Sequence, residues 1–215
     1  SWSPDGRKLV FAANAEDGWE YQAVESDIYA LDIGSGAITR LTSRHGPEAE
    51  PILSPDGRHL AYTGFEDRRQ FYQVSDLYVA DADGAHARNI TTAFDRDVQN
   101  PRWAGNGSIY FLYSDHGVTK LGRIGAGGGA VTTLLSNIGG TDLGRPYTGG
   151  AYSVNASGRY VATTSTSTRP ADLTLAGGRH LTALNEDLLS GRTIAQAEHI
   201  VVPSSADHRP IDAWI

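Results

Sequence analysis

The sequence predicts an all-β protein of the β-propeller class, with four visible blades of about 50 residues each. Three observations support this prediction: a hexapeptide that returns at a fixed interval, a second motif that keeps the same interval, and short apolar runs between them. A propeller blade is a four-stranded sheet, and one repeat unit corresponds to one blade. A β-sandwich gives no reason for such a period, so the propeller is favoured over it.

The hexapeptide is Trp-Ser-Pro-Asp-Gly-Arg at residues 2–7. It recurs as Leu-Ser-Pro-Asp-Gly-Arg at 53–58 and in more divergent forms at 103–108 and 154–159. Its glycines, 51, 50 and 51 residues apart, are Gly6, Gly57, Gly107 and Gly158. Proline presets φ, aspartate can bond to the backbone that follows it, and glycine accepts the positive φ of a tight turn. Each copy therefore predicts the first hairpin turn of a blade.

The second motif, Ser-Asp-Ile-Tyr-Ala-Leu-Asp at 26–32, returns as Ser-Asp-Leu-Tyr-Val-Ala-Asp at 75–81. Short apolar runs bounded by turn residues predict three further strands in each repeat. Their ranges are 9–12, 28–31 and 37–42, then 59–62, 77–80 and 87–91, then 109–112, 119–124 and 131–135, and finally 160–163, 172–175 and 180–183. With the strand that holds the hexapeptide, each repeat has four strands, and residues 1–184 form the predicted propeller.

After residue 184 the repeat stops. Residues 185–200 are predicted to be a linker out of the propeller, with a short helical stretch at 185–189 and a new strand beginning near 197. Residues 201–215 are predicted to begin a second domain. The first residues already lie inside a repeat, so we expect the chain to lack the start of its parent protein.

The repeat, with its Ile-Tyr-x-x-Asp and x-x-Leu-Thr segments, resembles the propellers of prolyl oligopeptidase-type (S9) serine peptidases and of the translocation protein TolB. The final segment, Asp-His-Arg-Pro-Ile-Asp-Ala-Trp-Ile at 207–215, favours the peptidases. It is similar to the Asp-Gly-x-x-Ile-x-x-Trp crossover that opens the α/β-hydrolase domain of acylaminoacyl-peptidase-like and dipeptidyl-peptidase-like enzymes. His208 stands where that motif has glycine.

The resemblance implies that this chain is the non-catalytic part of a propeller with seven or eight blades, which gates and docks peptide substrates. The serine, aspartate and histidine that hydrolyse peptides by acyl transfer would lie on the protein's own α/β-hydrolase domain, beyond residue 215. The parent would then be an enzyme, although this chain carries no catalytic residue. The alternative is a TolB-like propeller that binds proteins and has no catalytic activity.

Several functions are disfavoured by composition and motifs. The net charge is −7 and the 18 Lys and Arg residues are scattered, so nucleic acid is not an expected partner. No apolar run is long enough to span a membrane. Gly-x-Ser-x-Gly, His-Glu-x-x-His and phosphate-loop sequences do not occur, and the glycine string at 125–129 is predicted to be a hairpin turn. We expect no cofactor and no metal.

Other features remain weakly determined by the sequence. There is no cysteine, which leaves the redox compartment undetermined; a cytoplasmic location is expected, with a periplasmic one left open. The oligomeric state is open as well.

The acidic pairs Glu48 with Glu50, and Asp95 with Asp97, lie in connections between blades and are predicted to be solvated.

The loops between the second and third strands of the first two blades are the candidate contact surface. They are long and rich in aromatic and charged residues, and by strand parity they share a face with the connections between blades. The candidate substrate- or partner-contact residues are Trp19, Tyr21, Phe65, Arg68, Arg69, Phe71 and Tyr72. The alternative interpretation is that these aromatic side chains only cover the ends of the blades.

Overall fold

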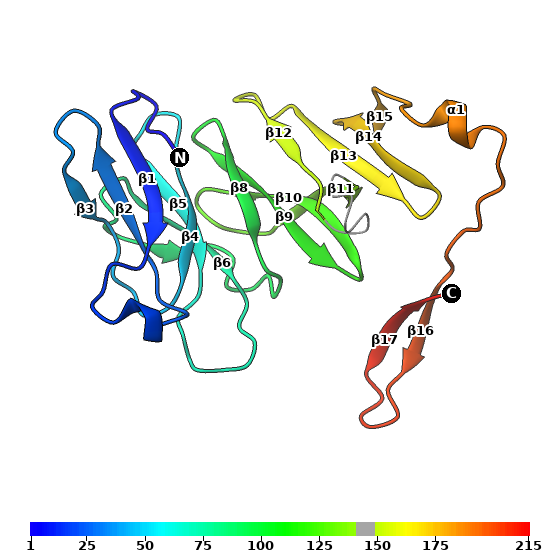
Figure 1. Cartoon of the computed structure of the whole chain (residues 1–215), viewed down its shortest axis with the longest axis horizontal. Coiled ribbons are helices and arrows are strands. Elements are labelled where there is room, and N and C mark those ends of the chain that lie inside the picture. Colours follow the sequence, from blue (N-terminus) through cyan, green and yellow to red (C-terminus); the bar gives the residue numbers. More distant parts are fainter. Residues whose placement is uncertain (141–148) are drawn as a thin grey trace. The chain divides into compact units, whose positions relative to one another are not determined.

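The computed structural model describes residues 1–140 and 149–215 (Figure 1). The chain divides into two compact units. Unit 1 comprises residues 1–113, 121–133 and 154–158, and unit 2 comprises residues 114–120, 134–153 and 159–215. Within the described residues, no helix is long and apolar enough to cross a membrane.

Unit 1 contains the first two blades, and both are antiparallel sheets. The strands of the first are β1 (Lys8–Ala13), β2 (Asp27–Asp32) and β3 (Ile38–Arg40). Those of the second are β4 (Glu48–Leu53), β5 (His59–Gly64), β6 (Asp76–Asp81) and β7 (Arg88–Asn89). Trp2 pairs with Leu9 as an isolated bridge at the place of the first blade's innermost strand. The strands follow the chain in order within each sheet, as successive hairpins require.

The third and fourth blades are joined in one sheet. The third consists of β8 (Gln99–Ala104), β9 (Ser108–Asp115), β10 (Val118–Gly125) and β11 (Thr132–Ile138). The fourth consists of β12 (Tyr152–Val154), β13 (Tyr160–Thr166), β14 (Arg169–Leu175) and β15 (Arg179–His180). The link between β11 and β13 is the pair Ile138 and Thr164, which lies inside unit 2. These elements confirm the all-β prediction.

The recurring hexapeptide forms the same hydrogen-bonded turn in the first two blades. The Ser3 hydroxyl donates to Asp5 Oδ1 at 2.6 Å and accepts from the Lys8 N–H at 2.8 Å. In the second blade the Ser54 hydroxyl donates to Asp56 Oδ1 at 2.6 Å. Gly6 and Gly57 follow with φ of 70° and 71°, values that glycine adopts without strain. The turn therefore needs serine, aspartate and glycine at their observed spacing.

The third copy of the hexapeptide departs from the sequence prediction. The residue with positive φ is Gly105 (60°), whereas Gly107 is not in the left-handed region. Ala104 pairs directly with Ser108, so the chain reverses through residues 105–107. The serine, proline and aspartate of the intact motif are absent from this copy. The hairpin therefore lies where the motif predicts it, but its left-handed residue stands two positions earlier than the repeat glycine.

In the first, second and fourth blades a threonine hydroxyl bonds to a backbone N–H of the third strand, on the side of the blade away from the hexapeptide turn. The Thr91 hydroxyl accepts from the Leu77 N–H at 2.9 Å and donates to Asp76 Oδ1 at 2.8 Å. Thr42 accepts from the Ile28 N–H at 2.9 Å in the first blade, and Thr182 repeats the arrangement in the fourth. These bonds explain why the Ser-Asp segment and the Leu-Thr segment recur together. The threonine hydroxyl of the second segment bonds to a backbone N–H of the first, and in the second blade also to its aspartate.

The core of unit 1 lies between neighbouring sheets. Ile28, Leu60, Tyr62 and Ala80 form one buried cluster. A larger cluster joins the second and third blades, and its buried members include Leu77, Trp103, Ile109, Phe111 and Tyr113. Each fully buried side chain of this size contributes about 1.5–3 kcal/mol relative to its exposed state. Packing between blades is therefore the main source of stability for this unit.

Unit 2 ends in a segment that leaves the repeat. The short helix α1 (Glu186–Leu189) is followed by residues without regular structure, then by β16 (His199–Pro203) and β17 (Pro210–Trp214). The last two strands pair with each other as an antiparallel hairpin. His208, in the turn of this hairpin, has φ of 59°, a conformation that favours glycine. This conformation explains why the Asp-Gly-x-x-Ile-x-x-Trp motif has glycine at the position of His208.

Candidate functional site

The two predicted contact loops lie at the same end of unit 1 (Figure 1). The first is residues 14–26, which include the 3-10 helix η1 (Trp19–Tyr21), and the second is residues 65–75. Six of the seven candidate side chains are exposed, and Phe65 is half-buried. The structure therefore places the candidates on two neighbouring loops of one unit. Their proposed role in contacting substrate stays a prediction.

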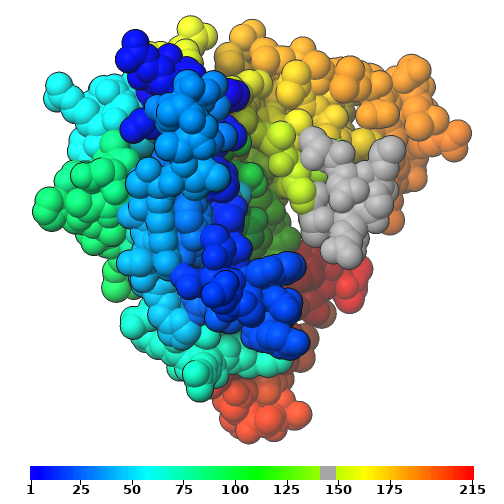
Figure 2. All heavy atoms as spheres, turned by 60° about the vertical axis from the view of Figure 1, so that its left-hand side comes forward, coloured from blue at the N-terminus to red at the C-terminus, as the bar shows by residue number. Residues whose placement is uncertain are grey.

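A short connection between the first two blades holds both loops. The Glu25 carboxylate, at the end of the first loop, accepts from the Gly46 N–H at 3.0 Å and contacts the His45 imidazole. The Asp67 N–H, in the second loop, donates to the His45 carbonyl at 3.1 Å. In the space-filling view the surfaces of the two loops are adjacent (Figure 2). Residues 45–46 thus form hydrogen bonds with both loops.

Gly46 is required where it stands. Its φ is 124°, and a Cβ atom there would lie 2.2 Å from the Phe65 carbonyl oxygen. The second loop therefore passes directly over the connection, with no room for a side chain. This contact also fixes the start of the loop that carries Phe71 and Tyr72.

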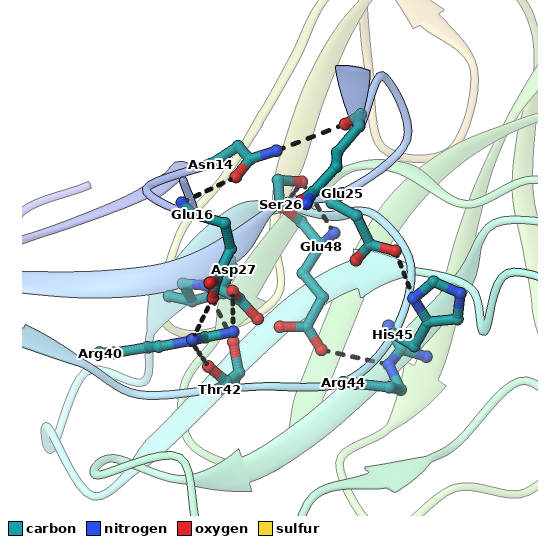
Figure 3. Close-up of polar contacts among 12 residues, drawn as sticks. Asn14, Glu16, Glu25, Ser26, Asp27, Arg40, Thr42, Arg44, His45 and Glu48 are labelled. Atoms are coloured by element: carbon teal, nitrogen blue, oxygen red, sulfur yellow. Dashed lines mark hydrogen bonds and ion pairs between the residues drawn. The ribbon is translucent and has the colours of Figure 1, made fainter. Parts of the chain in front are cut away.

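A buried ion pair lies beneath the connection (Figure 3). Glu48, the first residue of β4, has a side chain that is 0% exposed, and its Oε1 is 3.2 Å from Nε of Arg44. The backbone of Glu48 bonds to Ser26 in both directions: its N–H donates to the Ser26 carbonyl at 3.0 Å, and its carbonyl accepts from the Ser26 hydroxyl at 2.9 Å. The prediction that Glu48 is solvated is wrong, because Glu48 is already the first residue of β4 and lies buried against Ser26 of the first blade.

Aromatic rings enclose this ion pair. The guanidinium of Arg44 lies over the ring of Tyr78 at 4.0 Å, and Tyr78 stacks on Tyr62 with centroids 5.4 Å apart. Burial raises the pKa of Glu48, and the positive charge of Arg44 opposes that shift. Burial also raises the pKa of the Tyr62 hydroxyl, and the Glu48 carboxylate adds to the effect. The site is thus an ion pair inside an apolar interface. Removing either charge would leave the other one desolvated and without a partner.

A second ionic group anchors the first loop. The guanidinium of Arg40 contacts Asp27 Oδ2 and Glu16 Oε1, each at 2.5 Å (Figure 3). Its Nε donates to the Thr42 carbonyl at 2.9 Å. Burial raises the pKa of Asp27, and Arg40 counteracts this. The sequence identified Asp27 as a repeated residue but gave no sign of its partner, since Arg40 occupies a variable position of the x-x-Leu-Thr segment.

The second loop is tied down at its far end by Tyr72. Its hydroxyl donates to Asp97 Oδ2, and this hydrogen bond raises the pKa of Tyr72 to about 12. Asp97 also accepts from the Ser75 N–H at 2.8 Å. Phe71, next to it, is fully exposed. The neighbouring Arg69 has φ of 55°, and its N–H donates to Asp67 Oδ1 at 2.7 Å.

The two loops present exposed aromatic rings and charges of both signs. The first loop carries four carboxylates and no Lys or Arg between residues 14 and 25, and the second carries Arg68 and Arg69. Exposed aromatic rings beside charges of both signs are typical of protein and peptide contact surfaces. Among the residues that the structure describes, no group of three or more His, Asp or Glu side chains could hold a metal ion.

Comparison with known proteins places the repeat in a family. Residues 1–136 match the sequence profile of PD40, the TolB beta propeller domain. The chain is 31% identical over 127 residues to dipeptidyl-peptidase 5 of Porphyromonas gingivalis, a match that covers 58% of this chain and 19% of that protein. It is 35% identical over 75 residues to the Tol-Pal system protein TolB of Francisella tularensis, covering 34% of this chain and 16% of that protein.

The fold is similar to that of a solved peptidase. Acylaminoacyl peptidase of Pyrococcus horikoshii superposes with a TM-score of 0.75 and 21% identity, over 100% of this chain and 31% of that one. The chain thus spans a fifth to a third of the peptidases that it resembles. The repeat, the four-stranded blades and the profile match lead to one conclusion: the chain belongs to the PD40 family of TolB-type β-propeller domains.

Proposed function

We propose that this chain is the non-catalytic, substrate-gating and docking propeller portion of a serine peptidase of the prolyl oligopeptidase type. In this proposal the acyl-transfer chemistry takes place on an α/β-hydrolase domain of the same protein. The propeller would limit the size of peptides that reach that domain. It would also contact them through the loops at residues 14–26 and 65–75.

The observation that carries the proposal is the extent of the structural match. The superposition on the acylaminoacyl peptidase covers the whole chain, including the segment after the fourth blade. Among the sequence matches, that to dipeptidyl-peptidase 5 covers 58% of this chain and that to a TolB covers 34%. Both kinds of comparison thus support a propeller of the peptidase type over more of the chain than a TolB-type propeller.

The C-terminal hairpin adds physical support. Val201, Val202, Ile211 and Ile215 are all exposed, although they belong to strands or directly follow one. A two-stranded hairpin is marginally stable in water and needs further strands or a helix to bury an apolar face. The hairpin is thus suited to be the edge of a larger sheet, as the start of a hydrolase domain would be.

The second candidate is a TolB-like propeller that binds proteins without catalysis. The family profile favours it, since that profile covers residues 1–136, where the exposed aromatic loops lie, and so does the sequence match to a TolB. The two candidates differ in what they require beyond residue 215. The first needs a nucleophilic serine there, and the second does not.

The proposal is tested by assaying the 215-residue chain and the intact protein that carries it side by side. Chromogenic dipeptides, longer peptides and a folded protein serve as graded substrates. The proposal expects cleavage of the short substrates by the intact protein alone and no cleavage of the folded one. Peptide cleavage by the 215-residue chain that serine-directed inhibitors block would overturn it.

A further inference from the structure

The interface between the first two blades contains a cleft at the end where the hexapeptide turns lie. The cleft has a volume of about 700 Å³, and all of its lining residues belong to unit 1. Strand β1 runs from the hexapeptide turn to the first contact loop, so the cleft and the contact loops lie at opposite ends of the blades (Figure 1). The proposed function therefore makes no use of this cleft.

Two close contacts hold the blades together beside the cleft. A Cβ atom at Gly84, in the β6–β7 turn, would lie 1.9 Å from the carbonyl oxygen of Leu41. A Cβ atom at Gly57 would lie 3.8 Å from Cδ of Pro4, so the two hexapeptide turns also touch. The walls are thus already in place, and a ligand would bind without the cost of ordering them.

The cleft has an apolar floor and an acidic rim. Val10 and Ala30, both buried, contribute to the floor. Four carboxylates and one ammonium group also line the cleft, and they belong to Asp5, Asp32, Asp56, Asp83 and Lys8. Such a surface fits a side chain that is aliphatic along its length and cationic at its tip.

Hydrogen bonds within the turns keep the rim negatively charged. A bond from the Ser3 hydroxyl lowers the pKa of Asp5, and a bond from the Ser35 N–H lowers that of Asp32. The bonds described for Asp32 and Asp83 end on Oδ1 of each carboxylate. Their Oδ2 atoms can therefore accept hydrogen bonds from a cationic ligand.

The repeat identifies the corresponding position in the next interface. Thr39 of β3, which lines the cleft, pairs with Ala30, and Arg88 of β7 pairs with Val79. Ala30 and Val79 occupy the same place in the second motif, 49 residues apart, as Thr39 and Arg88 do in their strands. Arg88 is therefore the counterpart of Thr39.

Arg88 joins its blade to the following one. Its Nη2 donates to the carbonyl of Ala126 at 2.9 Å, and its Nη1 donates to the carbonyl of Gly127 at 3.1 Å. Both carbonyls belong to the β10–β11 turn of the third blade. The interface between the second and third blades thus contains a guanidinium that bonds to the backbone of a turn.

The first interface offers the same acceptors. Residues 81–84 and 125–128 form equivalent turns, since in each the fourth N–H donates to the first carbonyl at 2.8 Å. The carbonyls that Arg88 contacts therefore correspond to those of Ala82 and Asp83, which line the cleft. The short side chain of Thr39 cannot reach across as arginine does.

A second difference explains why there is space in the first interface. The first position of the hexapeptide is Trp103 in the third blade and Leu53 in the second. Trp103 belongs to the buried cluster between the second and third blades, where its ring centroid is 6.4 Å from that of His59. Leu53 lines the cleft at the equivalent position and is much smaller.

We propose that the cleft between the first two blades binds an arginine side chain of a polypeptide partner. The guanidinium would take the position that Arg88 has in the next interface and donate to the carbonyls of Ala82 and Asp83. The carboxylates of Asp32 and Asp83 would supply the opposite charge. Lysine fits less well, because its ammonium lacks the planar fork that reaches two acceptors at once. The site does not depend on whether the chain serves a peptidase or a binding propeller.

The test is a nuclear magnetic resonance titration of the full chain with acetyl-Gly-Arg-Gly amide. The same peptide with citrulline in place of arginine is the matched probe, because citrulline keeps the shape and lacks the charge. Saturable shifts are expected at Val10, Ala30 and Ala82, with a Kd on the order of 1 mM, the range of a ligand that buries one side chain. The citrulline peptide should bind at least about tenfold more weakly.

Three variants of the cleft separate its parts. Thr39→Arg gives the first interface its own arginine, and Leu53→Trp gives it the larger ring, so each should abolish binding of the peptide. Asp83→Asn keeps the Oδ1 acceptor and removes the charge, and it should weaken binding about tenfold. Asp187→Asn is the matched control, since Asp187 is an exposed carboxylate of unit 2, and it should change nothing.

Circular dichroism establishes that each variant keeps its strands. Shifts that do not saturate by about 20 mM peptide, or that lie away from the cleft, would overturn the proposal. Equal affinity for the citrulline peptide would overturn it as well, and so would undiminished binding to a folded Thr39→Arg or Leu53→Trp variant. Binding that is lost in both blocking variants, weakened in Asp83→Asn and unchanged in Asp187→Asn supports the site.

Discussion

The buried pair of Arg44 and Glu48 gives the sharpest stability prediction. Arg44→Met keeps the length of the side chain that lies over Tyr78 but removes the charge. Glu48→Leu removes the carboxylate from a position that is 0% exposed. Each single variant leaves one unpaired charge at the interface between two blades, and the double variant leaves none.

The expected magnitudes follow from this burial. Removing one partner of a buried ion pair destabilises a protein by about 3–5 kcal/mol, because the remaining charge is desolvated without compensation. Replacing both partners with apolar residues of similar volume is often neutral or stabilising. We therefore expect Arg44→Met to lower the free energy of unfolding by about 3 kcal/mol or more, and the double variant to recover most of that loss.

The assay is urea denaturation of the chain, followed by circular dichroism at pH 7 and pH 5. Burial raises the pKa of Glu48, so the carboxyl binds a proton more readily in the folded state than in the unfolded state. Its contribution to stability is complete below the unfolded-state pKa and declines as pH rises through the folded-state value. Arg44→Met should thus be less destabilising at pH 5 than at pH 7.

Two results would refute this reasoning. One is a loss below about 1 kcal/mol for Arg44→Met, which is the range of a solvent-exposed pair. The other is a double variant whose loss equals the sum of the two single losses, which would mean that the two side chains do not interact.

Three further changes test individual structural features. Thr91→Val leaves the buried Leu77 N–H unpaired, and urea denaturation should show a loss of about 1–3 kcal/mol. Gly84→Ala places a Cβ 1.9 Å from the Leu41 carbonyl oxygen at φ of 89°, so a clear fall in Tm is expected by calorimetry; an unchanged Tm would contradict the close approach. His208→Gly removes the strain of a left-handed residue and should leave the free energy of unfolding unchanged or raise it by up to about 1 kcal/mol. A fall in the free energy of unfolding by more than about 1 kcal/mol would contradict the turn conformation.

The regular part of the fold was accessible from the sequence because local chemistry determines it. The turn at residues 3–8 uses side-chain bonds between residues two to five positions apart, and those residues recur together. The strands follow from short apolar runs between such turns. Where the motif had lost its serine and aspartate, the hairpin kept its place but the left-handed residue is Gly105, which the glycine spacing alone could not show.

The site was only partly accessible. The long aromatic loops stood out because their composition differs from that of a hairpin turn. The support beneath them did not, because Arg44 and Glu48 become partners through the packing of two blades, and a carboxylate in a connection is ordinarily solvated.

The most direct test of the proposed function is to label the intact protein with a fluorophosphonate probe and to map the modified residue by mass spectrometry. The account predicts one adduct, on a serine outside residues 1–215. No adduct on the folded protein would contradict it and would favour the TolB-like binding propeller, and an adduct on a serine within residues 1–215 would contradict the assignment of this chain as non-catalytic.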